Sequence, residues 1–268
     1  MDVKVINISQ LYSLDGNATL KCFLSSQSNE MAKYNQNLPA LIIAPGGGYH
    51  FVSNREGDPI ALEFFTKHYN TFVLTYTVAP EGRYPLALTQ YACAVDWVRT
   101  NANDLHIDPN KIYVMGFSAG GHLTANLANF YHSLPIPAIN GKTLDAKVNG
   151  AVLCYPVITP SSHEGSFKNL LNVQDVHCPE AESLSLEKSV TKLNPPTFIW
   201  TTAQDSCVDP SATIVYAQAL KDAGVKYESH IFAYGEHGKA TFDSRTCTEA
   251  PSSNKIWMDL ADIFLKSL

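Results

Sequence analysis

A serine flanked by glycines stands where an apolar strand is expected to turn into a helix. Residues 112–115 are apolar, and the sequence GFSAGGHLTANL follows, with Gly116 and Gly120 two positions on either side of Ser118. On so sharp a turn the serine hydroxyl is exposed above the sheet, and larger side chains at the two glycines would collide with neighbouring backbone. We therefore interpret Ser118 as a nucleophile. The alternative is an ordinary strand–helix turn in which Ser118 caps the helix.

Strand-like apolar runs and helical patterns alternate along the rest of the chain. Strands are predicted within residues 3–8, 19–24, 39–49, 71–78, 111–117, 150–157, 195–203 and 226–235, and helices over residues 58–68, 86–99, 212–223 and 254–268. Asp15-Gly16 predicts a turn that makes a hairpin of the first two strands. The alternation predicts an α/β fold, with a mainly parallel central sheet and helices on both faces.

One long segment, residues 159–196, interrupts this alternation. It is polar and irregular, and we interpret it as a cap-like insertion over one end of the sheet. The chain has 268 residues and no internal repeat. That length suits one large α/β domain, so we expect a single domain over residues 1–268.

A serine hydroxyl needs a base to remove its proton, and the base needs an orienting carboxylate. In an architecture of this kind the acid and then the histidine follow the serine along the chain. His237 lies in the loop AYGEHGK, between a predicted strand and the C-terminal helix, where a base can reach over the carboxyl edge of the sheet. His122 lies one turn into the helix after Ser118 and is interpreted as a packing or supporting residue, and His230 lies inside a strand. His237 is the predicted base.

Two aspartates in TTAQDSCVDPS compete for the role of the acid. Asp205 lies nearer to the end of the preceding strand, where a carboxylate can be held at the rim of the sheet. Asp209 precedes a proline and a helix, so a helix N-cap is a strong alternative for it. We favour Asp205 as the acid.

The sequence APGGGYHF, residues 44–51, follows an earlier strand and holds three consecutive glycines. Acyl transfer develops negative charge on the former carbonyl oxygen, and backbone N–H groups must already point at that oxygen. One donor is expected at Ala119, directly after Ser118, and another in this loop, where glycine lets the backbone approach a ligand. A phosphate-binding loop is a weaker alternative, because neither G-x-G-x-x-G nor G-x-x-x-x-G-K-[ST] is present. A plain glycine turn is the other alternative.

At these residues the chain resembles the α/β-hydrolase superfamily, in its carboxylesterase branch with an HGGG-type loop. It looks most like small bacterial acetyl esterases and acetylxylan-esterase-like enzymes. The resemblance runs from about Leu41 to the C-terminal helix and rests on PGGGY, GFSAGGH, PPTFIWTTAQDSCVD and YGEHG in that order. It implies a serine hydrolase of carboxylic esters in which Gly47 and Gly48 share the oxyanion role with Ala119. Pro45 stands where many such enzymes carry histidine, so the anchoring of this loop is expected to differ.

The predicted substrate is an ester with a short acyl chain. Residues 159–196 contain charges and few large apolar side chains, which makes them a poor lid for lipid. Tyr49 and Phe51 add aromatic surface beside the glycine loop that can pack against a sugar or a small acyl group. The alternative is that these two rings only close the core beneath the loop. Acetyl and other short acyl esters, including acetylated sugars, are therefore expected.

Two other functions stay open. The fold also hosts non-catalytic ligand receptors, in which the base is typically lost, and the presence of Ser118, Asp205 and His237 argues against that function. An arylformamidase-like amidase is the alternative among enzymes. We expect no metal site, because no H-E-x-x-H or comparable spacing is present, and no organic cofactor, because acyl transfer needs none.

The charge and the cysteines of the chain limit which binding partners and which cellular compartment are expected. The net charge is −6 and the 19 Lys and Arg residues form no cluster, so nucleic acid and an anionic membrane are poor partners. No apolar stretch approaches the ~20 residues needed to cross a bilayer, and the N-terminus lacks the pattern of a secretory signal. Six scattered cysteines fit free thiols in a reducing compartment. We expect a cytoplasmic protein acting on a small-molecule ester, and the resemblance implies a possible homo-oligomer.

Overall fold

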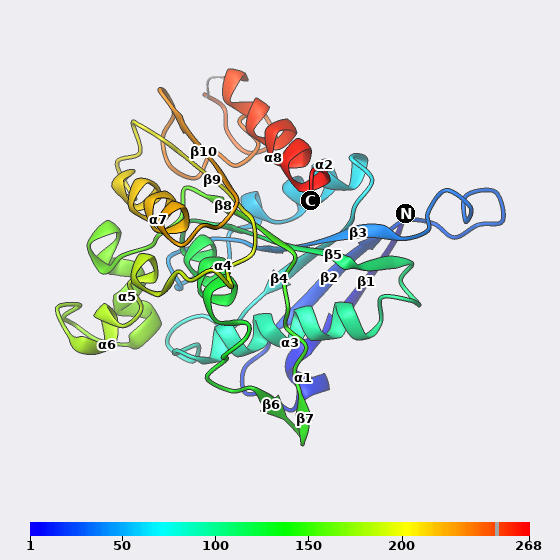
Figure 1. Cartoon of the computed structure of the whole chain (residues 1–268), viewed down its shortest axis with the longest axis horizontal. Coiled ribbons are helices and arrows are strands. Elements are labelled where there is room, and N and C mark those ends of the chain that lie inside the picture. Colours follow the sequence, from blue (N-terminus) through cyan, green and yellow to red (C-terminus); the bar gives the residue numbers. More distant parts are fainter. Residues whose placement is uncertain (250–251) are drawn as a thin grey trace.

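An eight-stranded sheet forms the centre of the computed structural model, which describes residues 1–249 and 252–268 (Figure 1). The strand order is β1-β2-β4-β3-β5-β8-β9-β10. Its strands are β1 (Asp2–Asn7), β2 (Thr19–Leu24), β3 (Leu38–Ala44), β4 (Asn70–Thr75), β5 (Ile107–Phe117), β8 (Gly150–Cys154), β9 (Thr197–Thr202) and β10 (Tyr227–Phe232). A separate small hairpin pairs β6 (Ala138–Ile139) with β7 (Lys142–Thr143). The α/β-hydrolase architecture expected from the sequence is thus present.

Seven of the eight strands point in the same direction, and β2 alone runs against them, which makes the two pairings at the β1–β2 edge antiparallel. β1 pairs with β2 as the predicted hairpin, with Asp2 opposite Leu24. The connection between β1 and β2 contains a short helix, α1 (Ile8–Tyr12), as well as the predicted turn region. β2 then pairs antiparallel with β4, and every later pairing in the sheet is parallel. Parallel strands place all their carboxyl ends at one edge, so the loops that follow them meet there.

Helices cover both faces of the sheet, as the alternation predicts. They are α2 (Asp58–Thr66), α3 (Leu86–Thr100), α4 (Ser118–Phe130), α7 (Ser211–Asp222) and α8 (Trp257–Lys266). One buried cluster packs the inner sides of α3 and α4 against the sheet, and a second packs α2 and α8 against the opposite face (Figure 1). A third, smaller cluster joins α7 to α4 and to the strands β8 and β9. The strands between these layers are buried on both faces, which explains their continuous apolar runs.

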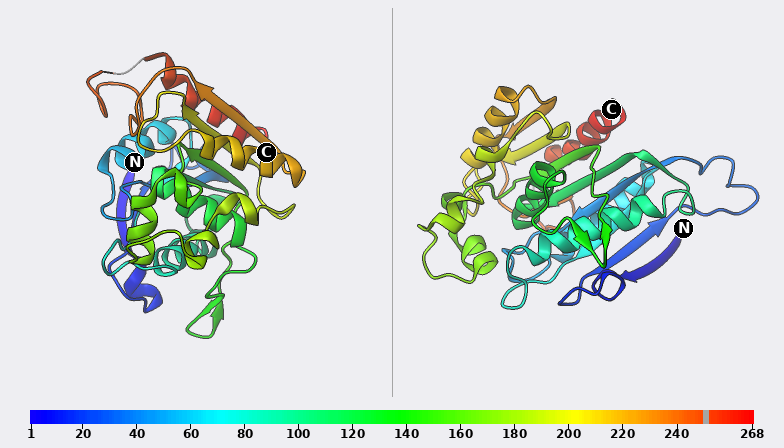
Figure 2. Two further views of the ribbon diagram at one scale, coloured as in Figure 1. Left: turned by 90° about the vertical axis from the view of Figure 1, so that its left-hand side faces the viewer. Right: turned by 60° about the horizontal axis from the view of Figure 1, so that its bottom comes forward.

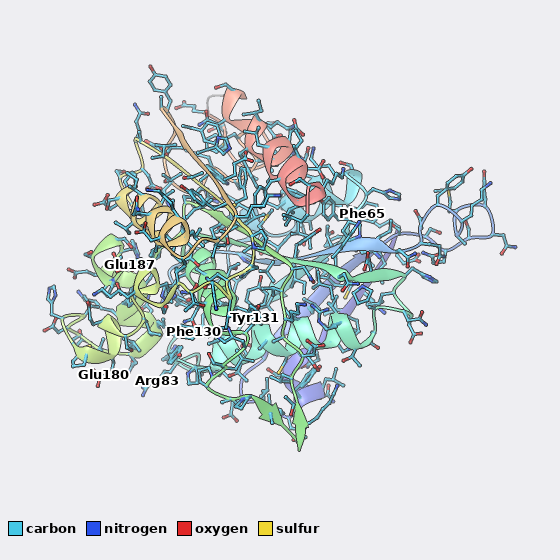
Figure 3. All side chains as sticks on the ribbon, in the orientation of Figure 1. Phe65, Arg83, Phe130, Tyr131, Glu180 and Glu187 are labelled. Carbon is cyan, nitrogen blue, oxygen red and sulfur yellow. The ribbon has the colours of Figure 1, made fainter. Side chains whose placement is uncertain are left out.

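The segment 159–196 lies between β8 and β9 and forms short helices at one end of the sheet (Figures 1 and 2). These are η2 (Pro160–Ser162), α5 (Glu164–Leu171), α6 (Pro179–Glu182) and η3 (Leu186–Ser189). Phe167 and Leu170 point inward and are buried. Charged side chains such as Glu180 and Glu187 lie on the outer side (Figure 3). Phe167 and Leu170 therefore pack against the body of the protein, whereas Leu193 is 49% exposed.

The described residues contain no helix that combines the length and the apolar character needed to cross a membrane. The longest helix of the described residues, α3, has 15 residues, and residues 87–96 within it are buried. Its apolar residues belong to the core of the protein.

Candidate active site

The turn between β5 and α4 has the strained geometry that its glycines predict. Ser118 begins α4 directly after β5 and has φ of 53°, in the left-handed region that non-glycine residues seldom adopt. A Cβ atom on Gly116 would lie 2.1 Å from the carbonyl oxygen of Gly120, and one on Gly120 would lie 2.1 Å from that of Ala44. Only glycine fits at these two positions, so the reason given for them from the sequence is confirmed.

Three predicted side chains form one line of hydrogen bonds at the carboxyl edge of the sheet. Nε2 of His237 lies 2.8 Å from Oγ of Ser118. Nδ1 of the same ring lies 2.6 Å from Oδ2 of Asp205. Ser118 comes from the β5–α4 turn, Asp205 from the loop after β9, and His237 from the loop after β10. An imidazole that holds its Nδ1 proton toward Asp205 presents Nε2 to the serine as a proton acceptor.

The carboxylate of Asp205 is fixed by its own loop. Its side chain is fully buried, and Oδ1 accepts hydrogen bonds from the N–H groups of Cys207 and Val208, both at 2.9 Å. Asp209 lies at the start of α7, where Oδ1 accepts the N–H of Ser211 at 2.8 Å. Of the two aspartates, the structure thus brings Asp205 to His237 and leaves Asp209 bonded to the first residue of α7.

The other two histidines considered from the sequence lie elsewhere. His122 is fully buried, with Nδ1 2.9 Å from the hydroxyl of Tyr49 and Nε2 3.1 Å from the carbonyl oxygen of Leu184. Burial lowers the pKa of His122 to about 4, so the ring is neutral in the folded protein. His230 lies on β10, where Nε2 contacts Oε1 of Glu228 at 2.7 Å. Neither ring lines the cleft around Ser118.

The glycine loop after β3 presents free N–H groups beside Ser118. Gly47 and Gly48 have φ of 124° and 63°, and both line the same cleft as the serine. Over residues 1–249 and 252–268, no protein atom accepts a hydrogen bond from either N–H group. Ala119 follows Ser118 in the first turn of α4, where N–H groups have no partner within the helix. These three N–H groups can therefore serve an oxyanion.

The backbone of the glycine loop is held by hydrogen bonds with three side chains outside it. The hydroxyl of Tyr76 donates to the carbonyl oxygen of Pro45 at 2.8 Å. Glu56 Oε2 accepts the N–H of Gly46 at 2.8 Å, and Nδ2 of Asn169 donates to the carbonyl oxygen of Gly48 at 2.8 Å. With proline in place of the histidine common in similar loops, these three contacts hold the loop.

A cleft of about 230 Å³ opens over these groups. It is lined by Gly47, Gly48, Phe51, Ser53, Arg55, Glu56, Ser118, His163, Cys207, His237 and Gly238. Phe51 lies at its wall and is 55% exposed, in keeping with the expected aromatic surface.

Tyr49 requires a correction. Its side chain is 1% exposed, it does not line the cleft, and its ring packs edge-on against Tyr76 and His122. Tyr49 has φ of 57°, which turns the chain there and directs the ring inward, away from the Phe51 side. The alternative stated for it, a residue that closes the core beneath the loop, is the one the structure shows.

Sequence reasoning missed three residues around the cleft, namely Glu56, Tyr155 and His163. Oε1 of Glu56 accepts the hydroxyl of Tyr155 at 2.8 Å, and the Tyr155 ring lies edge-on to His237 with centroids 4.8 Å apart. His163 comes from the segment 159–196 and lines the same cleft as Ser118 and the glycine loop. Burial and the neighbouring His237 lower the pKa of His163 below its ordinary value. Glu56 and His163 stand in polar stretches, SNREGDP and SSHEGS, and no pattern in the sequence separates them from surface residues.

His163 is held in one tautomer. Its Nδ1 accepts the backbone N–H of Ser166 at 3.1 Å, so in the neutral ring the proton is on Nε2. Oγ of Ser166 lies 2.9 Å from the same Nδ1. The wall of the cleft thus carries an imidazole whose Nε2–H is available as a donor.

No group of three or more His, Cys, Asp and Glu side chains suited to holding a metal ion is found among the residues that the structure describes. The polar groups of the cleft are instead arranged as a serine, a base, an acid and backbone donors. Such a set can carry out nucleophilic acyl transfer without an inorganic ion.

The chain is similar to a known protein family and to several known proteins. Residues 29–220 match the BD-FAE family. The chain is 34% identical over 203 residues to endo-1,4-beta-xylanase B of Butyrivibrio fibrisolvens, and 29% identical over 232 residues to acetylxylan esterase of Xylanibacter ruminicola. These alignments cover 74% and 84% of this chain but only 32% and 44% of those proteins. The chain therefore spans less than half the length of these curated relatives.

A solved structure matches over nearly the whole length. It is that of an acetyl ester-xyloside bifunctional hydrolase from Caldicellulosiruptor lactoaceticus, with a TM-score of 0.83 and 32% identity. The match covers 98% of this chain and 96% of that one. The two chains therefore share one overall fold over nearly their whole length.

Proposed function

Because the chain belongs to the BD-FAE family and has the fold of the α/β-hydrolase esterases, we propose that it is a serine esterase of short-chain acyl esters. Acetyl esters, including acetylated sugars, are the proposed substrates. The observation that carries the proposal is the line of hydrogen bonds from Asp205 through His237 to Ser118, at the floor of a cleft that also holds free backbone donors.

The first half of the proposed reaction acylates the serine. Oγ of Ser118 attacks the ester carbonyl carbon while Nε2 of His237 takes the hydroxyl proton. The carbonyl oxygen becomes an oxyanion, and the proposed donors to it are the N–H groups of Gly47, Gly48 and Ala119. The imidazolium then gives its proton to the alcohol oxygen, the carbon–oxygen bond breaks, and the alcohol leaves an acyl-enzyme behind.

The second half releases the acid. Water attacks the acyl carbon while Nε2 of His237 takes one of its protons, and the proton returns to Oγ of Ser118 as the carboxylic acid departs. Asp205 stabilises the imidazolium formed in each half and keeps the imidazole in the tautomer that faces Ser118. No cofactor enters this sequence of steps.

The dimensions and lining of the cleft support a short acyl group and a polar alcohol. Its volume of about 230 Å³ falls below the ~300–1,000 Å³ of ordinary drug-sized pockets. Phe51 offers an apolar surface, and Nε2–H of His163 offers a donor to an alcohol or sugar oxygen. We propose that residues 159–196 act as a partial cap that contributes this donor. Because Phe167 and Leu170 are buried, the segment presents little apolar surface for a long acyl chain.

A comparison of substrates tests the proposal. Turnover of p-nitrophenyl acetate is expected to exceed that of N-formylkynurenine and of an aminoacyl anilide by at least tenfold. Faster cleavage of N-formylkynurenine would favour the arylformamidase-like amidase. Absence of turnover on all three substrates, with a small ligand still bound in the cleft, would favour the non-catalytic receptor.

A further inference from the structure

One buried carboxylate connects the glycine loop to the base. Oε2 of Glu56 accepts the N–H of Gly46, next to the proposed oxyanion donors. Oε1 accepts the hydroxyl of Tyr155, whose ring lies against His237. A Cβ atom built on Gly46 would lie 2.8 Å from Oε2 of Glu56 and 2.9 Å from Cβ of Ser118, so the carboxylate and the serine flank this glycine. A single side chain therefore contacts both halves of the site.

The charge of this carboxylate has no salt-bridge partner in the described part of the chain. Glu56 is 3% exposed, and the ion pairs of the described residues do not include it. Burying a carboxylate is strongly unfavourable unless it is compensated. Burial accordingly raises the pKa of Glu56, while the hydrogen bonds from Tyr155 and Gly46 and the positive charge of a protonated His237 lower it. Both carboxylate oxygens accept from donors, which is the arrangement of the ionised form.

Tyr155 is itself held in an unusual backbone conformation. It follows the end of β8 with φ of 36°, in the left-handed region, and its N–H donates to the carbonyl oxygen of Trp200 at 2.6 Å. Strain of this kind persists where the surroundings fix the residue, and it concentrates at functional sites. Its ring packs against Phe117 and Trp200 as well as His237. The hydroxyl is thereby directed at Glu56.

From this geometry we propose that Glu56 is a positioning residue of the esterase site. The inference rests on the proposed function, because it assigns a second anion that acts on the base of that reaction. Glu56 holds the oxyanion loop through Gly46 and holds the wall behind His237 through Tyr155. Its negative charge also favours the imidazolium that forms when His237 takes the serine proton. Asp205 does this through a direct hydrogen bond, whereas Glu56 acts through space.

Several other groups share this electrostatic environment. The titratable and charged groups that face Glu56 are Arg55, Tyr76, Cys154, Tyr155 and His237. Those that face His237 are Asp205, Ser118, His163, Tyr155 and Glu56. Burial raises the pKa values of Tyr76, Cys154 and Tyr155 well above neutrality. Glu56 and Asp205 are therefore the buried acids that face His237, whereas its chain neighbour Glu236 is exposed and pairs with Lys239.

The test is Glu56→Gln, which removes the charge and keeps the shape. The amide oxygen can accept the N–H of Gly46 while the amide NH₂ donates to the Tyr155 oxygen, so both contacts have a replacement. Without the nearby negative charge the imidazolium that forms at His237 during the reaction is stabilised less. The acid limb of the kcat/KM profile on p-nitrophenyl acetate is expected to move down by about one pH unit. A weaker base also lowers kcat, by roughly three- to tenfold, while KM stays unchanged.

Asp58→Asn is the matched control. It removes one negative charge two residues away, at the exposed N-terminus of α2, where Asp58 pairs with Lys21. Its pH profile is expected to coincide with that of the wild type. A Glu56→Gln profile and kcat that also coincide with the wild type, whatever its thermal stability, would overturn the proposal.

Labelling of Ser118 by a fluorophosphonate tests the positioning role of Glu56 independently of whether the protein cleaves esters. The labelling rate depends on the serine and its base and needs no natural substrate, so its pH profile is measured in the same variants. If the protein labels but cleaves no ester, the proposed function fails, and a shifted labelling profile in Glu56→Gln still supports the positioning role. An unshifted labelling profile contradicts that role even if esters are cleaved.

Tyr155→Phe is the second variant should Glu56→Gln fail to fold. It removes one hydroxyl and keeps the ring against His237. A fall in kcat with unchanged KM supports the connection from Glu56 to the base, and an unchanged kcat overturns it.

Discussion

Replacing Asp205 by asparagine perturbs one atom of the site and reverses one hydrogen bond. Oδ1 of Asp205 accepts two backbone N–H groups, from Cys207 and Val208, so an asparagine oxygen is expected to occupy that position. The amide NH₂ group then replaces Oδ2, 2.6 Å from Nδ1 of His237. A donor would face a donor unless the imidazole changes tautomer. The ring relieves this by moving its proton to Nε2, which leaves it unable to accept the proton of Ser118.

The expected loss follows from this reversal. A wrong tautomer with the geometry otherwise intact lowers kcat by about 10⁴ in serine hydrolases of known mechanism. At ~1.36 kcal/mol for each factor of ten, that is about 5 kcal/mol of transition-state stabilisation. Because the oxyanion donors and the cleft remain, KM on p-nitrophenyl acetate is expected to change little and a residual rate above the uncatalysed reaction should persist.

Asp209→Asn provides the control for this measurement. Asp209 accepts only the N–H of Ser211 with its side chain, and asparagine caps a helix about as well as aspartate. Its kcat should match the wild type, and its free energy of unfolding should change by less than about 0.5 kcal/mol. Initial rates and thermal melts of both variants are the assay. A large loss of kcat in Asp209→Asn together with a small one in Asp205→Asn would refute the assignment and the tautomer argument with it.

Three further outcomes are expected. Ser118→Ala should fold normally, lose about 10⁶ in kcat and lose fluorophosphonate labelling; an active alanine variant contradicts the nucleophile. Folded His122 stays neutral down to about pH 4, whereas the unfolded chain takes up a proton below about pH 6.5. The free energy of unfolding should therefore fall by about 1.4 kcal/mol for each pH unit between those values as the pH is lowered, a slope that denaturant titrations should find reduced in His122→Asn. Activity on p-nitrophenyl esters should fall steeply beyond about four acyl carbons, since a long apolar groove would instead add up to ~0.8 kcal/mol for each buried methylene; efficient cleavage of the decanoate would contradict the short cleft.

Local patterns made the fold and the turn at Ser118 predictable. The strand before Ser118 and the helix after it are each readable from a few residues, and two glycines are required by backbone contacts that any such turn creates. The order of strands and helices along the chain then places the later loops at the same edge of the sheet. Hence Asp205 and His237 could be chosen from their distance to the ends of their strands.

Contacts between distant segments were not predictable in the same way. Glu56 and Tyr155 are 99 positions apart in the chain, and their hydrogen bond exists only after β8 and the loop after β3 are packed together. Within that loop no periodicity fixes the direction of a side chain, so Tyr49 and Phe51 read alike in the sequence. In the structure Tyr49 has a left-handed backbone conformation and its ring is buried, whereas Phe51 is exposed.

Three residues with a strained backbone lie where the proposed chemistry needs the chain to turn. Tyr49, Ser118 and Tyr155 all have positive φ, and they follow the neighbouring strands β3, β5 and β8. Each costs of order 1–3 kcal/mol, and each is held by a specific contact. The Tyr49 hydroxyl bonds to His122, the Ser118 carbonyl oxygen accepts the N–H of Val157, and the Tyr155 hydroxyl bonds to Glu56. Glycine would relieve the strain at any of the three but would delete the side chain that the turn directs into place. The strain is therefore retained because it points the nucleophile into the cleft and two tyrosines into the layer that supports it.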